Sequence, residues 1–461
     1  MTRQLVVVVK SDCPTCQLVT PLLPRIDARV VSEDDAAGLV ESYSMGIETV
    51  PTIVVLDGSG REVERLEGWD AVAWERVTGV DGLGEGLPPH RPGCGSKTLD
   101  PGVADDLAVR FGGSKLRARR VEIASIEDEI EAMFDRGWTD GLPVVPPTEA
   151  RVLRMLEGTS RAPDDIVAVV PPDLVECTVE KVAINAVMAG CKPEYLPVVL
   201  AAVAAACTDE FNMHGLLATT YFSGPMIVVN GPIARAVGMN SGHNALGQGN
   251  RANATIGRAL QLVVRNVGGG RPGEIDRATL GNPGKYSFCF AEDEEGSPWE
   301  PLSVSRGHAA GASTVTLFAG EGVRGIVDQL SRSAASLARS FAACLRTVAH
   351  PKLPMSFDAV VVVSPEHARV FREAGWSRPR VIEELHSLLQ LPGSEIVRGA
   401  GGIEEGVPEA FADATLPKFR PDGLLLVHAG GTAGLFSAIV GGWVNGATGS
   451  QPVTMEVEPW L

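Results

Sequence analysis

Two cysteines separated by two residues, at the junction of an apolar strand and a helical stretch, constrain this chain most. Residues 5–9 are Leu-Val-Val-Val-Val, and they lead into Cys13-Pro14-Thr15-Cys16. The spacing allows one disulfide, and the positive end of the helix dipole favours a thiolate at Cys13. Pro14 suits a first helical turn because its missing N–H would have no partner there. A lowered thiol pKa beside a second thiol is what thiol–disulfide exchange requires.

The first 80 residues show a regular alternation of strand and helix signals. Apolar and β-branched runs predict strands, and the segments between them have helical composition. The turn at 57–60 separates two of these strands and predicts a hairpin. The expected order is strand, helix, strand, helix, strand, strand, helix, over residues 5–9, 14–23, 28–31, 34–43, 53–56, 61–66 and 69–77.

These residues resemble the thioredoxin/glutaredoxin superfamily. The resemblance rests on Cys13 and Cys16 and on the tripeptide Val50-Pro51-Thr52 just before a strand. It implies a thioredoxin-like domain over residues 1–80, with Cys13 as the nucleophile and Cys16 as the resolving cysteine. It also implies that Pro51 is a cis-proline and that Pro51 and Thr52 border a groove for a partner's extended cysteine segment.

Two positions refine this resemblance. Pro14-Thr15 is closer to glutaredoxin-like members than to the Gly-Pro centre of thioredoxins. Asp12 stands where thioredoxins have a tryptophan. An acidic neighbour opposes thiolate formation at Cys13.

The rest of the chain is expected to be a linker followed by a large α/β region. Residues 81–118 are rich in Gly and Pro, which predicts a linker carrying Cys94. Apolar strands alternate with helical stretches beyond it, and we find no internal repeat. We expect an α/β substrate domain over 119–352 and a C-terminal α/β lobe over 353–461.

Cysteines outside the first 80 residues supply the next candidates for chemistry. Cys94 is a candidate third thiol, exposed in the linker, although an incidental loop cysteine is an equal alternative. Cys191 follows the C-terminus of a helix, which raises a thiol pKa, and precedes Lys192, whose charge partly offsets this effect. Cys289 lies in an aromatic strand and is expected in the core. We therefore take Cys13, Cys16, Cys94 and Cys191 as the candidate catalytic residues.

A segment dense in Gly and Asn, residues 239–253, is the candidate substrate-binding loop. It contains His243, Asn244, Asn250 and Arg251 and leads into a helix. Glycines let the backbone approach a ligand, and helix N-terminal amides favour an anion. A long surface loop with helix caps is the alternative. No phosphate-loop lysine motif or dinucleotide fingerprint is present, so nucleotide binding is not supported.

The chain from about residue 90 onward is similar to bacterial UGSC-type (seleno)proteins that carry a thioredoxin domain. Three phrases carry this similarity: Gly93-Cys94-Gly95-Ser96, Thr178-Val179-Glu180-Lys181-Val182-Ala183-Ile184-Asn185 and Ser364-Pro365-Glu366-His367. Lys97 stands where the UGSC motif has its cysteine. This similarity does not imply any particular reaction for the chain.

Composition excludes several classes of protein. The net charge of −17 and the lack of a basic block argue against nucleic-acid binding. No apolar run is long enough for a membrane helix, and the N-terminus has no signal-peptide cleavage site. We therefore expect a cytoplasmic protein without a membrane partner. Alanine- and glycine-rich helices are compatible with a homo-oligomer.

These observations favour a thiol-dependent oxidoreductase. We expect a cysteine of the large region to react with a small organic substrate and the Cys13/Cys16 pair to recycle it. The scheme needs an external thiol reductant or reductase protein, and we expect no cofactor and no metal. A zinc site built on Cys13 and Cys16 is an alternative for the pair. A carbon–sulfur-type lyase or sulfur-transfer enzyme, and a redox-gated sensor of a small ligand, are alternatives for the whole protein.

Overall fold

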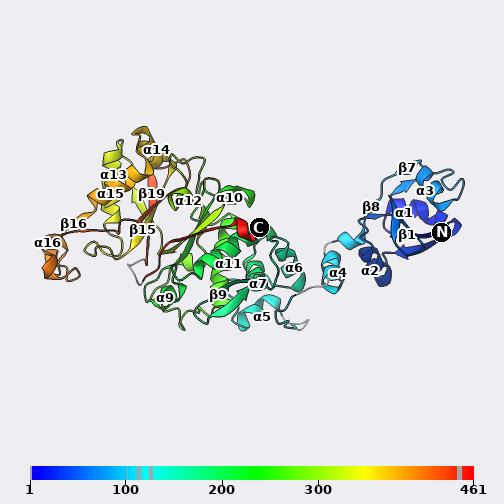
Figure 1. The fold of residues 1–461 in the computed structure, drawn as a ribbon, viewed down its shortest axis with the longest axis horizontal. Helices are drawn as coiled ribbons and strands as arrows, with labels where there is room; N and C mark the ends of the chain where they lie inside the picture. Colours follow the sequence, from blue (N-terminus) through cyan, green and yellow to red (C-terminus); the bar gives the residue numbers. More distant parts are fainter. Residues whose placement is uncertain (1–2, 101, 112–115, 124–127, 444–448) are drawn as a thin grey trace. The chain divides into compact units, whose positions relative to one another are not determined.

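The computed structural model describes residues 3–461 except 101, 112–115, 124–127 and 444–448. The chain divides into two compact units, Met1–Lys115 with Glu149–Leu153, and Leu116–Thr148 with Arg154–Leu461. Both units combine helices and strands, as the predicted α/β class requires (Figure 1). In the described part of the chain, no helix combines the length and the apolar character needed to cross a bilayer.

The first unit is built on a four-stranded mixed sheet in the order β2-β1-β4-β5. β1 runs parallel to β2 and antiparallel to β4, which in turn is antiparallel to β5. The valines of β1 are buried in a core that also contains Trp69 and Trp74. The expected order of strands and helices is confirmed by β1 (Gln4–Val9), α1 (Pro14–Val19), β2 (Ala28–Ser32), α2 (Ala36–Ser44), β4 (Thr52–Leu56), β5 (Glu62–Glu67) and α3 (Ala71–Thr78).

The predicted linker proves wrong in its first part, because its backbone pairs with the first unit. β7 (His90–Arg91) is antiparallel to β6 (Trp69–Asp70), and β8 (Cys94–Gly95) is antiparallel to β3 (Thr49–Val50). The Lys97 N–H then donates to the buried carboxylate of Glu33 over 2.8 Å. Glycines and prolines exclude long regular elements but allow two-residue strands on an open edge. α4 (Val103–Phe111) follows in the same unit.

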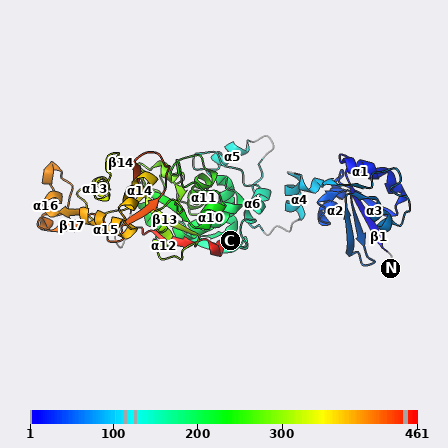
Figure 2. The same ribbon diagram turned by 90° about the horizontal axis from the view of Figure 1, so that it is seen from above.

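The second unit is organised around an eight-stranded sheet. Figure 1 labels most of its elements, and Figure 2 shows them from above. Its strands are β11 (Gly224–Asn230), β12 (Cys289–Ala291), β13 (Thr314–Gly320), β14 (Arg324–Val327), β15 (Asp358–Val363), β18 (Leu424–His428), β19 (Phe436–Gly442) and β20 (Val453–Glu456).

Helices and two small two-stranded sheets complete this unit. These sheets pair β9 (Ile166–Val170) with β10 (Val175–Thr178) and β16 (Gln390–Pro392) with β17 (Thr415–Pro417). The helices are α5 (Glu129–Asp135), α7 (Val179–Ala189), α8 (Leu196–Ala206), α9 (Met213–Ala218), α10 (Pro232–Ala236), α11 (Arg251–Asn266), α12 (Leu302–Ser305), α13 (Ala334–Leu345), α14 (Pro365–Glu373), α15 (Arg378–Leu388) and α16 (Gly393–Ile396), and α6 (Glu149–Leu156) spans the boundary between the units.

The eight-stranded sheet consists of two halves with the same pairing pattern. β11 is parallel to β12 and antiparallel to β13, and β15 is parallel to β18 and antiparallel to β19. The register is also the same, since Gly224 lies opposite Gly320 and Asp358 lies opposite Gly442. The halves meet where Gly320 pairs with Gly442. This internal repeat was not predicted from the sequence.

The halves also exchange strands. β14 follows β13 in the chain but pairs with β19, and β20 follows β19 but pairs with β13. The buried ion pair of Glu292 and Arg378, 3.2 Å apart, adds a second link between the halves. The predicted division into separate lobes at 352/353 is therefore wrong. The position does lie between the halves, but strand exchange makes them one sheet.

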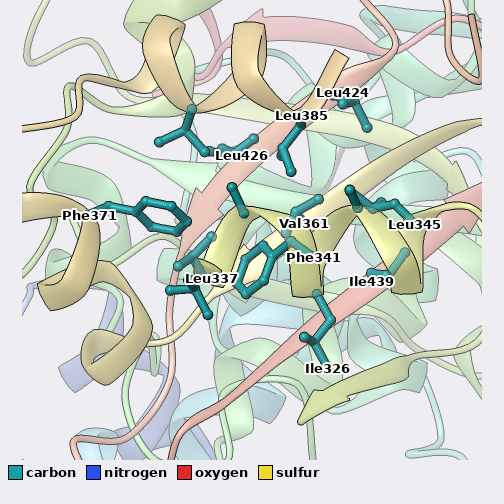
Figure 3. Packing of buried hydrophobic residues seen from close by; sticks show 14 of the residues in the cluster. Ile326, Leu337, Phe341, Leu345, Val361, Phe371, Leu385, Leu424, Leu426 and Ile439 are labelled. Atoms are coloured by element: carbon teal, nitrogen blue, oxygen red, sulfur yellow. The ribbon is translucent and has the colours of Figure 1, made fainter. Parts of the chain in front are cut away.

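Alternating valines show how the layers pack. On β15, Val361 and Val363 face a core with α13, α14 and α15, whereas Val360 and Val362 face a core shared with β11 and β13. Figure 3 shows Leu337, Phe341 and Leu345 of α13 packed near Val361 and Ile439. On the other half, α8 packs on β13 and α11 packs on β11 and β12.

Candidate thiol site

Cys13 lies at the N-terminus of α1, where it caps the helix. Its Sγ accepts a hydrogen bond from the backbone N–H of Cys16 over 3.2 Å, and Pro14 occupies the first helical turn. The side chain is completely buried. The strand-to-helix junction predicted from the sequence therefore does place this sulfur against helix N-terminal amides.

Cys94 lies directly against Cys13. The two sulfurs are 2.8 Å apart, and the Cys13 sulfur is also 3.5 Å from the carbonyl oxygen of Val50. Cys94 is only half-buried. The hydroxyl of Thr15 donates to the carbonyl of Pro92 over 2.7 Å and anchors the segment that carries Cys94. Pairing of β8 with β3 thus makes Cys94 an ordered part of the site, not an exposed linker cysteine.

The three thiols differ in acidity. Burial opposes ionisation of Cys13, but hydrogen bonds from Cys94 and from Cys16 lower its pKa below the ordinary value. The hydrogen bond with Cys13 and partial burial raise the pKa of Cys94. Burial raises the pKa of Cys16 far above that of a free thiol. The hydrogen bond between the two sulfurs thus favours ionisation of Cys13 over ionisation of Cys94.

The negative charge of Asp12 is screened by water and by a neighbouring lysine. The Asp12 side chain is 62% exposed and lies 3.6 Å from the ammonium of Lys10. Water and this lysine both weaken its field at Cys13. The expected opposition to thiolate formation is correspondingly small.

Pro51 and Thr52 lie beside the thiols but are already engaged. The peptide bond between Val50 and Pro51 is cis, as expected. Thr52 is fully buried, and its hydroxyl donates to the carbonyl of Thr49 over 2.6 Å. The strand edge before Pro51 is occupied by β8 of the same chain. A partner's extended segment would therefore have to displace residues 94–95.

Cys191 is not suited to a catalytic role. Its side chain is 6% exposed, and its sulfur donates to the carbonyl of Thr255 over 3.4 Å. Burial raises its pKa to about 12. Lys192 does not offset this, since burial of the sulfur dominates. Cys289 lies close by, and burial also raises its pKa, as expected for a core residue.

Asn250 and Arg251 prove to be structural rather than ligand-binding. Asn250 caps α11 by accepting a hydrogen bond from the Asn253 N–H over 3.0 Å. The Arg251 guanidinium donates to the carbonyl of Gly190 over 2.9 Å, at the end of α7. A cation at a helix C-terminus satisfies free carbonyls. The alternative of a loop with helix caps is correct for this part of the segment.

Asn244 lies at a cavity of the second unit. It lines a space of about 420 Å³ together with Ser364 and Gly431. The His243 ring does not line this space but packs against Gly431, where a side chain would collide with it. Asn244 therefore remains a candidate for ligand contact, and His243 adjoins a residue of the cavity wall. None of the eight cysteines, all of which lie in described parts of the chain, lines this cavity.

A second cavity of about 500 Å³ was missed at the sequence level. Ser223, Gln261 and Arg265 line it. Gln261 and Arg265 are one helical turn apart on α11, which is a detectable signal for a shared face. Nothing in the local sequence indicates that Ser223 joins them.

No protein-family model matches this chain, and no curated protein is significantly similar to it. Over the described residues, no group of three or more His, Cys, Asp and Glu side chains is arranged to hold a metal ion.

Proposed function

We propose that this protein is a thiol–disulfide oxidoreductase of thioredoxin-like type in which Cys94 reacts with the substrate and Cys13 recycles it. The observation that carries this proposal is the 2.8 Å contact between the Cys13 and Cys94 sulfurs. The sheet order β2-β1-β4-β5 and the cis peptide at Pro51 support the thioredoxin-like assignment.

The exposures of the three thiols support an order of events. Cys13 and Cys16 are fully buried, whereas Cys94 is partly accessible. A substrate disulfide therefore meets Cys94 first. Cys94 passes its proton to the Cys13 thiolate and attacks the substrate disulfide. A Cys94–substrate mixed disulfide forms, and the other half of the substrate leaves as a thiolate that takes up the proton from Cys13.

Cys13 and Cys16 then restore Cys94. The Cys13 thiolate attacks the Cys94 sulfur, which forms the Cys13–Cys94 disulfide and releases the remaining substrate thiolate. Cys16, after losing its proton, attacks the Cys13 sulfur, forms Cys13–Cys16 and frees Cys94. Two electrons have passed to the substrate, and an external dithiol or reductase protein returns them.

Trapping of the intermediate tests this order. Oxidised glutathione is added to the Cys16→Ser variant, and disulfide-linked peptides are identified by mass spectrometry without reductant. We expect the Cys13–Cys94 disulfide in Cys16→Ser and no Cys13–Cys16 disulfide in the control Cys94→Ser, which lacks the thiol that glutathione meets first. Glutathione attached to Cys13 with Cys94 free in Cys16→Ser would refute the proposed order.

Ligand binding without chemistry in the second unit is the second candidate. The cavity beside Asn244 supports it, because no thiol lines this space. Titration of the reduced and the oxidised protein with one ligand would distinguish a redox-gated sensor, whose affinity changes between the two forms, from an independent site.

A further inference from the structure

The cavity lined by Ser223, Gln261 and Arg265 gathers hydrogen-bond donors that have no acceptor among the described residues. It has a volume of about 500 Å³ and lies between α9, the start of β11, the second half of α11 and the segment up to Tyr286. The buried atoms Ser223 Oγ, Gln261 Nε2 and Arg265 Nε line it without hydrogen-bond partners. Ser223 is only 1% exposed. Buried donors without acceptors are unfavourable, so their convergence indicates a missing acceptor.

Among the described residues that line this cavity, Arg265 is a cation without an ion pair. The acidic lining residues are already paired, Asp140 with Arg258 over 2.8 Å and Asp276 with Lys285 over 2.7 Å. Arg265 has only a long contact of 3.5 Å to the Gly137 carbonyl among the described residues. Burial and the neighbouring charge of Arg271 lower the pKa of Arg265. An anion would relieve both effects.

The other half of the sheet shows which group belongs at this place. Gly224 and Asp358 hold the same register position, the first residue of β11 and of β15. The buried Asp358 carboxylate accepts hydrogen bonds from Arg420, one of them over 3.1 Å. At Gly224 there is no side chain, and a Cβ would lie 3.0 Å from Cγ of the flexible Lys285 side chain and 3.7 Å from Gln261 Nε2. The second half thus has the carboxylate of Asp358 at this register position. The first half has Gly224 there, next to the donor Gln261.

We propose that this cavity binds the carboxylate of a small organic acid. Arg265 provides the charge, and Gln261 and Ser223 provide further donors to the carboxylate oxygens. The remaining wall is apolar and suits a hydrocarbon tail; it consists of Met213, Leu216, Leu217 and Val264. The site does not depend on the thiol chemistry of the first unit.

Calorimetric titration of the full-length protein tests this site. The probes are hexanoate, its neutral isostere hexanamide and inorganic phosphate. We expect hexanoate to bind at least about tenfold more tightly than hexanamide, because charged hydrogen bonds discriminate strongly. Binding of phosphate without hexanoate, or equal affinity for hexanoate and hexanamide, would overturn the proposal.

Variants locate the binding site. Arg265→Gln is expected to weaken hexanoate about tenfold or more. The matched control is Arg235→Gln, since Arg235 is 77% exposed and pairs with Glu295 outside the cavity. Unchanged hexanoate affinity in Arg265→Gln would contradict the assignment.

A third variant supplies the carboxylate internally. Gly224→Asp gives the first half the residue that Asp358 provides in the second half. We expect the folded variant to lose hexanoate binding, and persistent binding would count against the proposal. Should this variant fail to fold, Ser223→Ala tests the same site, with a several-fold loss of hexanoate affinity expected and unchanged affinity refuting its role.

Discussion

At the scale of single residues, the chemistry of this protein depends on which sulfur carries the negative charge. Cys13 accepts a hydrogen bond from the Cys16 N–H and shares one with the Cys94 sulfur, and together these lower its pKa although burial opposes this. At Cys16, which is buried as deeply, burial outweighs the hydrogen bond from the Lys10 backbone and raises the pKa. Two thiols in one motif thus acquire opposite roles from burial and hydrogen bonds.

Removal of the Cys94 donor should raise the pKa of Cys13. We expect Cys94→Ala to shift the first thiolate titration, followed by ultraviolet absorbance, to higher pH, because the charged form loses a hydrogen bond. Cys94→Ser is the matched control, since a hydroxyl still donates, and its titration should stay near that of the wild type. If this absorbance change disappears in Cys13→Ser, the thiolate that titrates first is that of Cys13. Identical titrations of Cys94→Ala and the wild type would show that Cys94 does not stabilise the thiolate.

At the scale of elements, the site depends on a two-residue strand. β8 brings Cys94 to Cys13 by pairing with β3, and this approach needs Gly93. A Cβ at Gly93 would lie 2.7 Å from the Val50 carbonyl oxygen and 2.4 Å from the Thr49 methyl group. The glycine before the cysteine is therefore required by packing, which explains one residue of the Gly-Cys-Gly-Ser phrase physically.

Substitution of this glycine should separate the two sulfurs. We expect Gly93→Ala to lower the stability of the first unit by about 1–3 kcal/mol and to slow Cys13–Cys94 disulfide formation in the Cys16→Ser background. Gly95→Ala is the control on the same strand, because nothing lies within 4 Å of its Cβ position. Denaturant unfolding and disulfide mapping measure the two effects. Equal behaviour of the two alanine variants would mean that β8 tolerates displacement.

At the scale of the whole molecule, strand exchange decides how the second unit behaves. β14 follows the strands of the first half in the chain but pairs with β19 of the second half. β20 follows the strands of the second half but pairs with β13 of the first half. The pair of Glu292 and Arg378, almost completely buried, also crosses between the halves. Neither half retains its full set of strand partners without the other, so the halves should unfold together.

Matched core substitutions test this cooperativity. Leu317 of β13 and Leu426 of β18 are both buried, one in each half. We expect Leu317→Ala and Leu426→Ala each to destabilise by about 2–5 kcal/mol and to lower the same calorimetric transition. Val7→Ala, in the core of the first unit, should leave that transition in place. Two separable transitions for the two halves would contradict cooperative unfolding.

Local sequence patterns were sufficient for part of this structure. The valine run of β1, the proline after Cys13 and the turn at 57–60 act through neighbouring residues, so strand, helix and hairpin follow from them directly. Within the same range, the peptide bond before Pro51 is cis, as the resemblance implied.

The sequence by itself thus determined the α/β class, the order of elements in residues 1–80 and the helix-capping position of Cys13. Only the tertiary structure decided that Cys94 lies against Cys13, that Cys191 is buried, and that Ser223 and Arg265 line the same cavity. The same holds for the exchange of β14 and β20. The physical reason is range: backbone propensity acts over a few residues, whereas strand pairing and burial join segments tens to hundreds of residues apart.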